Sequence, residues 1–400
     1  MADPAFRAAV LAAHGARGAE VDELLAYAES AFAPAAPPAG GWPLPDEPFA
    51  AAWEEYAARA ADEGAAAILA GVLPQLRFPV QAGIGASDAY RAATLRGEPT
   101  AHPEGGLVFA DPEGIRLFLH PTPAGRLPVV VARARADFVA LLCALTRRNE
   151  PDPVPDSMGA CIVGGYNNWD RVARLRRAWE AAHPAAAAAG GWAAHFRAEV
   201  VPRKELYQDR FVLLSSGPYS AVEAGALGLD GEEWPAKSLA IRLEHECAHY
   251  FTRRVWGSMR NSLHDELLAD YQGIRAAEGR YRADWFLRFV GLEDPTAYRE
   301  GGRLQNYRGT PPLSDGAFRV LQALVRSAAA RLEAIDLLRP RGAAGPAEAA
   351  RALGALAALS LEELASPDAP ARFRRAYGER PLTASPAAPR AASGIPRAAL

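Results

Sequence analysis

The sequence predicts an α+β protein in which a mixed α/β N-terminal region precedes a mainly helical domain with a small sheet. Two observations support this fold class. Alanine-rich segments of helical character occupy much of the chain, and short apolar runs bounded by glycine, proline or aspartate stand between them. With 400 residues, of which 50% are hydrophobic and 23% charged, the chain is globular and large enough for two domains.

The N-terminal region, 1–149, is expected to mix helices and strands. Its predicted helices cover residues 3–32, 47–72 and 137–148. Its predicted strands cover residues 107–109, 115–119 and 127–131. The stretch 33–43, rich in alanine, proline and glycine, is a predicted linker. No chemical motif occurs in this region.

The second domain is predicted to span 150–338, after a polar, proline-broken boundary near Asn149. Its predicted strands begin at Cys161 and Phe211, and its predicted helices cover residues 170–182, 238–254, 262–271, 275–290 and 315–338. The C-terminal region, 339–400, is predicted to hold two shorter alanine-rich helices and a disordered tail at 385–400.

The pentapeptide His-Glu-Cys-Ala-His, which begins at His245, is the clearest chemical signal in the chain. Residues four apart lie on one face of a helix, so the imidazoles of His245 and His249 can converge on one ion. Glu246, turned partly aside, can then reach a water bound to the metal. Pro235 suits a first helical turn, and residues 238–254 lack glycine and proline, so the motif is predicted to lie within a helix.

A second helix is predicted to supply the third ligand. The first helix is expected to end at Gly257, and the chain then turns back antiparallel into a helix capped by Ser262 or Asn261. Glu266 and Asp270 are again four residues apart. One carboxylate can bind the metal while the other accepts a hydrogen bond from a liganding imidazole.

This pattern, HExxH followed by a glutamate with an aspartate four residues later, resembles that of the gluzincins, the thermolysin-like superfamily of zinc metallopeptidases. The resemblance covers roughly residues 235–275 and implies a zincin-like catalytic domain with Zn²⁺ as cofactor. It implies His245, His249 and Glu266 as zinc ligands, Glu246 as general base and Asp270 as the partner of a liganding histidine. The implied substrate is a peptide or a small amide-containing molecule.

Two competing assignments of the ligands fit less well. The metzincins have glycine and histidine at the positions that Thr252 and Val255 occupy here. His264 is a rival for the third ligand. Over its whole length the chain is similar to an uncharacterised bacterial family of zincin-like proteins, in the stretches 155–161 and 165–171 and the ten residues from His245. That similarity implies no substrate.

The expected reaction is hydrolysis, in which zinc lowers the pKa of a bound water towards about 7 and Glu246 takes its proton. An oxyanion usually needs a second donor, and the candidates are Tyr250, His264, Tyr271, Arg210 and Tyr219. The resemblance also gives residues 213–217 a role in pairing with extended substrate at a sheet edge. Their continuous apolar character favours a strand buried on both faces instead.

Other functions remain open from the sequence. The pentapeptide can be a charged helical face, a structural zinc clip in a non-catalytic scaffold, or part of a non-haem iron site, although Glu246 has no role in iron chemistry of that kind. A zinc enzyme that tailors a small metabolite is the alternative with a different reaction.

Composition limits the partners and the compartment. A net charge of −3 with no basic stripe predicts no nucleic-acid partner. Cys143, Cys161 and Cys247 lack the spacing of a disulfide framework or thiolate site, which favours a reducing cytoplasm. The N-terminal residues lack a signal-peptide pattern, and no apolar run reaches the roughly 18 residues of a membrane span, so a cytoplasmic protein without a membrane partner is expected. The oligomeric state and the substrate-binding residues are left unassigned.

Overall fold

The protein is an α+β protein, as predicted: helices predominate and four strands form one mixed sheet. The computed structural model describes residues 3–29, 32, 41–257, 262–342 and 345–378. The chain forms two compact units, Pro45–Gly217 and the remainder, Met1–Leu44 with Pro218–Leu400. The ranges predicted from the sequence divide the chain differently, because strands from both sides of Asn149 join a single sheet.

The unit Pro45–Gly217 contains the sheet, whose strand order is β1-β2-β4-β3. The strands are β1 (Ile115–Thr122), β2 (Gly125–Ala132), β3 (Ala160–Asn167) and β4 (Gln208–Ser215). β4 runs parallel to β2 and antiparallel to β3, so it is paired on both sides. Its residues Phe211 to Leu214 are fully buried. An edge role for residues 213–215 is therefore wrong, and the favoured alternative of a buried core strand is confirmed for them, whereas residues 216–217 follow the strand.

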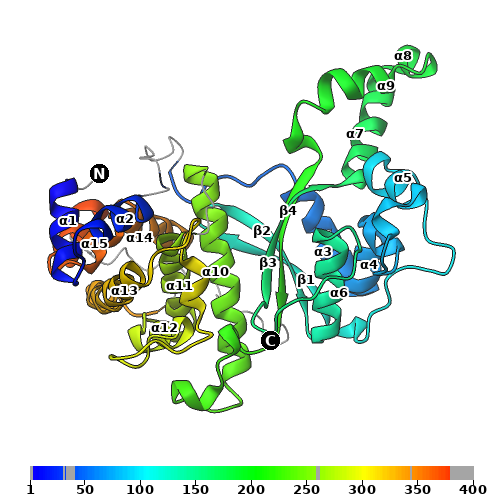
Figure 1. Ribbon diagram of the computed structural model, residues 1–400. Helices are drawn as coiled ribbons and strands as arrows, with labels where there is room; N and C mark the ends of the chain where they lie inside the picture. Colours follow the sequence, from blue (N-terminus) through cyan, green and yellow to red (C-terminus); the bar gives the residue numbers. More distant parts are fainter. Residues whose placement is uncertain (1–2, 30–31, 33–40, 258–261, 343–344, 379–400) are drawn as a thin grey trace. The chain divides into compact units, whose positions relative to one another are not determined.

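Helices cover this sheet within the same unit (Figure 1). The helices of this unit are α3 (Ala50–Glu63), α4 (Ala65–Val72), α5 (Asp88–Arg96), α6 (Arg135–Thr146), α7 (Trp169–Ala182), α8 (Pro184–Ala188) and α9 (Trp192–His195), of which α7 to α9 extend away from the sheet. α3 and α4 contact β1, and α6 contacts β2, β3 and β4. The single helix predicted at 47–72 is two helices, because Gly64 adopts φ 85° between them. The strand predicted at 107–109 is wrong: these residues are irregular, and Val108 is 87% exposed.

The other unit is helical in its described part. Its helices are α1 (Pro4–Ala13), α2 (Ala19–Tyr27), α10 (Trp234–Trp256), α11 (Leu263–Glu278), α12 (Ala283–Val290), α13 (Asp315–Asp336), α14 (Pro346–Ala357), α15 (Leu361–Ala365) and α16 (Ala369–Tyr377). α13 contacts α2, α12, α15 and α16 and so lies at the centre of the packing. The helix predicted at 275–290 is interrupted, because α11 ends at Gly279 with φ 73° and α12 begins only at Ala283. The described range 345–378 contains three helices instead of the two predicted, and the predicted tail at 385–400 lies outside the described residues.

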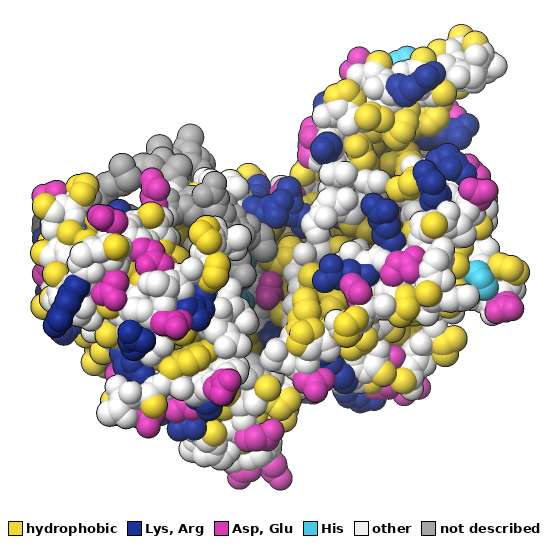
Figure 2. Space-filling view, in the orientation of Figure 1, with side chains coloured by type: hydrophobic (Ala, Val, Ile, Leu, Met, Phe, Trp, Pro, Cys, Tyr) yellow, Lys and Arg dark blue, Asp and Glu magenta, His cyan; other side chains and the backbone are white. Residues whose placement is uncertain are grey.

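The surface carries both signs of charge. On the face shown in Figure 2, Lys and Arg side chains lie among Asp and Glu side chains, in keeping with a net charge of only −3. None of the helices in the described ranges combines the length and the apolar character that crossing a bilayer requires.

α10 and α11 form an antiparallel pair that carries the predicted site. α10 ends at Gly257 in the left-handed conformation, and the side chain of Ser262 caps α11 by accepting a hydrogen bond from the backbone of Asp265. Contacts between the helices run in opposite order, from Ile241 with Gly273 to His249 with Asp265. Both helix ends and the direction of the second helix are therefore those predicted from the sequence.

Gly273→Ala is expected to destabilise the protein by about 1–3 kcal/mol, because the new Cβ would lie 2.6 Å from the carbonyl oxygen of Ile241. A backbone atom in a packed helix cannot move aside as a flexible side chain can. Gly354→Ala in α14 is the matched control, since nothing lies within 4 Å of its Cβ, and it should stabilise by about 1 kcal/mol through helix propensity. Urea denaturation measures the change in the free energy of unfolding for each variant. Equal changes for the two substitutions would contradict the close contact at Gly273.

Candidate metal centre

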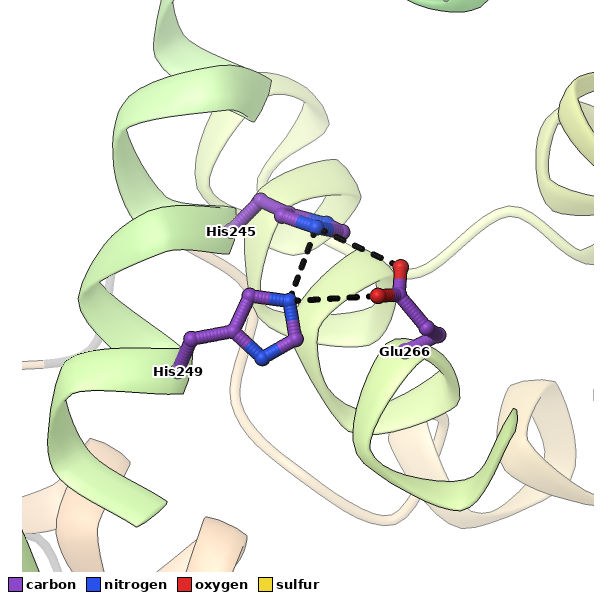
Figure 3. A group of neighbouring side chains, drawn as sticks. All are labelled: His245, His249 and Glu266. Carbon is purple, nitrogen blue, oxygen red and sulfur yellow. Dashed lines mark hydrogen bonds and ion pairs between the residues drawn. The ribbon is translucent and has the colours of Figure 1, made fainter. Parts of the chain in front are cut away.

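Three side chains that the sequence singles out converge between α10 and α11. His245 and His249 extend from α10 toward Glu266 of α11 (Figure 3). The two Nε2 atoms lie 3.1 Å apart. Each also lies 3.5 Å from one oxygen of the Glu266 carboxylate, His245 from Oε2 and His249 from Oε1. All three residues are buried, and in the described part of the chain this is the group of ligand types close enough to hold one metal ion.

The spacing of these atoms fits a tetrahedral metal. Bonds of about 2.0–2.2 Å from a tetrahedral ion to its ligands place the ligand atoms about 3.3–3.6 Å apart. The observed separations are 3.1 Å between the two Nε2 atoms and 3.5 Å from each Nε2 atom to a different oxygen of the Glu266 carboxylate. Two imidazole nitrogens and one carboxylate oxygen are also a donor set that zinc accepts. The residues present therefore fit a bound divalent ion without rearrangement of the helices.

Carboxylates on the far side of both rings orient the imidazoles. Nδ1 of His245 lies 2.9 Å from Oδ1 of Asp270, and Nδ1 of His249 lies 2.9 Å from Oδ2 of Asp265. A carboxylate can only accept at these distances, so each imidazole donates from Nδ1 and directs the lone pair of Nε2 toward Glu266. The lone pairs of the two Nε2 atoms and the carboxylate of Glu266 therefore face one another. A cation can bind to all three groups at once.

Asp270 is held by a buried network that reaches a distant segment. Its Oδ1 also accepts a hydrogen bond of 2.5 Å from the hydroxyl of Tyr219, and its Oδ2 is ion-paired with Arg303. Arg303 in turn donates to Tyr219 at 2.9 Å and to Ser220 at 3.1 Å. Burial acts to raise the pKa of the Asp270 carboxyl, but the charge of Arg303 and the hydrogen bond from His245 outweigh it and hold the pKa below its usual range. Asp270 is therefore ionised where it faces His245.

Electrostatics within the cluster favour a cation. Burial acts to raise the pKa of Glu266, but its hydrogen bond with His249 and the nearby positive charges lower the pKa well below its ordinary value. Burial acts to lower the pKa of His249, yet the hydrogen bonds with Asp265 and Glu266 raise it well above its ordinary value. The same carboxylates that favour a proton on this ring favour a metal ion on its Nε2.

The charges of the three clustered residues affect the pKa of the neighbouring Glu246. Burial raises the pKa of its carboxyl, the charges of His245 and His249 lower it, and that of Glu266 raises it again. The side chain is only partly buried, in contrast to the three clustered residues. Cys247, the next residue, is fully buried within the helix pair, and burial raises the pKa of its thiol well above the usual range. It packs as a small apolar side chain.

The other residues considered from the sequence are placed differently. Tyr219 joins the site through Asp270, whereas the hydroxyl of Tyr271 donates to Asp336 and accepts from Arg339. Arg210 belongs to the other compact unit, where it pairs with Glu47. Tyr250 is buried in α10. Of the five donors proposed for an oxyanion, Tyr219 contacts a side chain of the cluster directly, since its hydroxyl lies 3.0 Å from Nδ1 of His245.

His264, the rival ligand, does not belong to the group of side chains that could hold a metal ion, which is His245, His249 and Glu266. Its ring packs edge-on against Phe32 at 5.3 Å and hydrogen-bonds the backbone of Leu356, and its Nε2 is buried without a hydrogen-bond partner among the described residues. Burial lowers the pKa of this imidazole to about 4. His264 is therefore neutral at pH 7.

The low pKa of His264 predicts acid lability. Between its unfolded pKa of about 6.5 and its folded pKa of about 4 the unfolded chain binds the proton and the folded chain does not, so stability is lost as the pH falls, by about 3 kcal/mol in total. His264→Gln keeps a donor for Leu356 but cannot titrate. Urea denaturation at about pH 7 and about pH 4.5 should show a smaller loss for the variant than for wild type. Equal losses would contradict the assignment.

Sequence reasoning missed three residues at this site. Asp265 has no role in the assignment made from the sequence, although its position beside Glu266 is a usable signal. Arg303 and Tyr307 lie in the short helix η8 (Arg303–Tyr307), and Tyr307 reaches the Glu266 carboxylate. The local sequence of η8 contains no motif that indicates a role at the site, because it is the packing of the chain that brings η8 to α11.

Fold and site together define an α+β protein with a candidate metal centre on an antiparallel helix pair. The chain belongs to a protein family of unknown function, DUF7005, whose model matches residues 9–368 and so includes His245, His249 and Glu266. No curated protein and no solved structure matches the chain.

Proposed function

We propose that this protein is a zinc-dependent hydrolase of peptide or amide bonds, related in its site to the gluzincins. The observation that carries the proposal is the convergence of two imidazoles and one carboxylate: the Nε2 atoms of His245 and His249 lie 3.1 Å apart, and each lies 3.5 Å from one oxygen of Glu266. The gluzincin resemblance supports the same assignment, with Glu246 as general base and Asp270 as the partner of His245.

The ligand number supports a catalytic centre over a structural clip. Structural zinc sites are closed by four protein ligands, whereas catalytic sites use three and leave one position for water or substrate. Within the described ranges the metal-competent group has three members. A structural scaffold and an enzyme that tailors a small metabolite remain the alternatives. A protein side chain in the fourth coordination position would favour the structural scaffold.

Each residue has a defined part in the proposed reaction. A divalent ion held by the three ligands would polarise a substrate carbonyl and make a water acidic enough to lose a proton near neutral pH. Glu246, beside the first ligand, accepts that proton and returns it to the leaving amine. Asp270 and Asp265 keep the two imidazoles oriented, and Arg303 keeps Asp270 ionised.

The test is metal content, measured by elemental mass spectrometry on wild type, His249→Ala and His183→Ala. His183 is an exposed histidine in the other compact unit, so its removal controls for nonspecific binding to imidazole. One zinc per chain in wild type and His183→Ala, with none in His249→Ala, is the expected result. A wild type that takes up no metal after zinc is added would refute the metal centre. Zinc uptake without cleavage of any member of a broad peptide and amide panel would refute the reaction.

A further inference from the structure

The two histidines of the centre are oriented by carboxylates in unlike surroundings. Asp270 accepts from Tyr219 and His245 through Oδ1 and is ion-paired with Arg303 through Oδ2, so both of its oxygens are engaged. Asp265 is only 2% exposed, and its Oδ2 lies 2.9 Å from Nδ1 of His249. Its Oδ1 is buried without a hydrogen-bond partner among the described residues.

The position of Asp265 in α11 explains how it reaches His249. Asp265 and Glu266 are consecutive in the first turn of α11, and the Ser262 side chain accepts from the Asp265 backbone at 3.4 Å. Glu266 approaches Nε2 of His249 and Asp265 approaches Nδ1 of the same ring. One helix end therefore holds both nitrogens of this imidazole. The positive end of the helix dipole also favours two carboxylates there.

Burial makes a purely structural role for Asp265 costly. An ionised carboxylate in a buried site is unfavourable unless a positive charge or several donors compensate it. Asp270 has Arg303 for this purpose. The described partners of Asp265 are the imidazole of His249 and the first turn of α11. A cation on the other nitrogen of His249 supplies the missing compensation, because the imidazole transmits its charge to the Nδ1–H group.

We infer that Asp265 is a positioning residue of the metal centre, which holds His249 in the Nδ1–H form so that Nε2 faces the ion. This inference rests on the metal centre proposed above and extends it, since each histidine ligand then has its own buried carboxylate. Asp265 touches no substrate in this assignment. It acts on the metal through His249.

The experiment compares zinc affinity, by competition with a chromophoric chelator, in wild type, Asp265→Leu, Asp265→Asn and Glu278→Gln. Asp265→Leu removes the acceptor and the charge and should weaken zinc binding by about 100-fold, whereas Asp265→Asn keeps an acceptor and should weaken it by about 10-fold. Glu278→Gln removes a carboxylate from the last turn of the same helix, where it pairs with Lys237, and should leave the affinity unchanged.

A spectroscopic readout separates positioning from a general loss of structure. In NMR of the zinc-loaded protein labelled with ¹⁵N on histidine, the Nδ1 proton of His249 should be hydrogen-bonded and protected from exchange with water in wild type and Asp265→Asn, whereas Asp265→Leu should lose that protection. Wild-type affinity in both Asp265 variants would overturn the inference. If Asp265→Leu does not fold, Asp265→Asn decides, and an unchanged affinity in that variant overturns it as well.

The outcomes also separate this inference from the proposed function. The assays need zinc and no substrate. A wild type that binds zinc but cleaves nothing refutes the proposed reaction, while the order of affinities still decides the role of Asp265. A wild type that binds no zinc refutes both.

Discussion

Glu246→Gln is expected to keep the zinc and to lower turnover by about 10²- to 10⁴-fold, the usual contribution of a general base. Glutamine has the size and shape of glutamate, so α10 and the three ligands should stay in place. Its amide cannot accept the proton that the attacking water must lose. Elemental analysis for zinc and kcat on any substrate found by the screen are the two measurements.

Glu266→Ala is the matched comparison, because it removes a carboxylate of the same cluster that is a proposed ligand. This variant should lose both the metal and the activity, since the two imidazoles alone do not complete the set of three ligands. The two substitutions therefore separate metal binding from proton transfer. Full activity in Glu246→Gln, or full zinc content in Glu266→Ala, would refute the role assigned to that residue.

Arg303→Met is expected to lower the free energy of unfolding by about 3–5 kcal/mol, because it removes one partner of a buried ion pair. The carboxylate of Asp270 is fully buried, and Arg303 also donates to Tyr219 and Ser220. Methionine fills similar volume without replacing the charge. Urea denaturation of the metal-free protein measures this effect independently of zinc.

Arg299→Met is the control for this prediction. Arg299 precedes the same short helix and pairs with Glu293, but its side chain is 47% exposed, so solvent screens the pair. Its loss should cost at most about 1 kcal/mol. Similar effects of the two substitutions would show that Arg303 does not stabilise Asp270 as described.

Much of the candidate site could be predicted because its residues lie on two helices. Helical periodicity alone places His245 with His249, and Glu266 with Asp270, on single faces. The ends of α10 and α11, at Gly257 and Ser262, follow from local capping chemistry. The α+β class was predictable for a similar reason, since the long helical segments and the main apolar runs are local features.

Predictions that depended on long-range pairing were less accurate. The apolar triplet at 107–109 finds no partner strand, and Val108 is exposed. β4 was predicted as a strand, but its interior place between β2 and β3 is a property of the whole sheet. A strand's neighbours are selected by packing of distant segments, which the alternation of residues within the strand does not encode.

The sequence by itself determined which chemical groups the candidate site contains: two histidines at helical spacing, an adjacent glutamate and a second helix with acids four residues apart. The tertiary structure decided which of those acids serve which ring. It assigned Asp265 to His249, excluded His264 from the cluster and brought Arg303 to Asp270. The reason is physical: periodicity sets which side chains share a helix face. The register of α10 against α11, with its close contact at Gly273, and the packing of η8 set which faces meet.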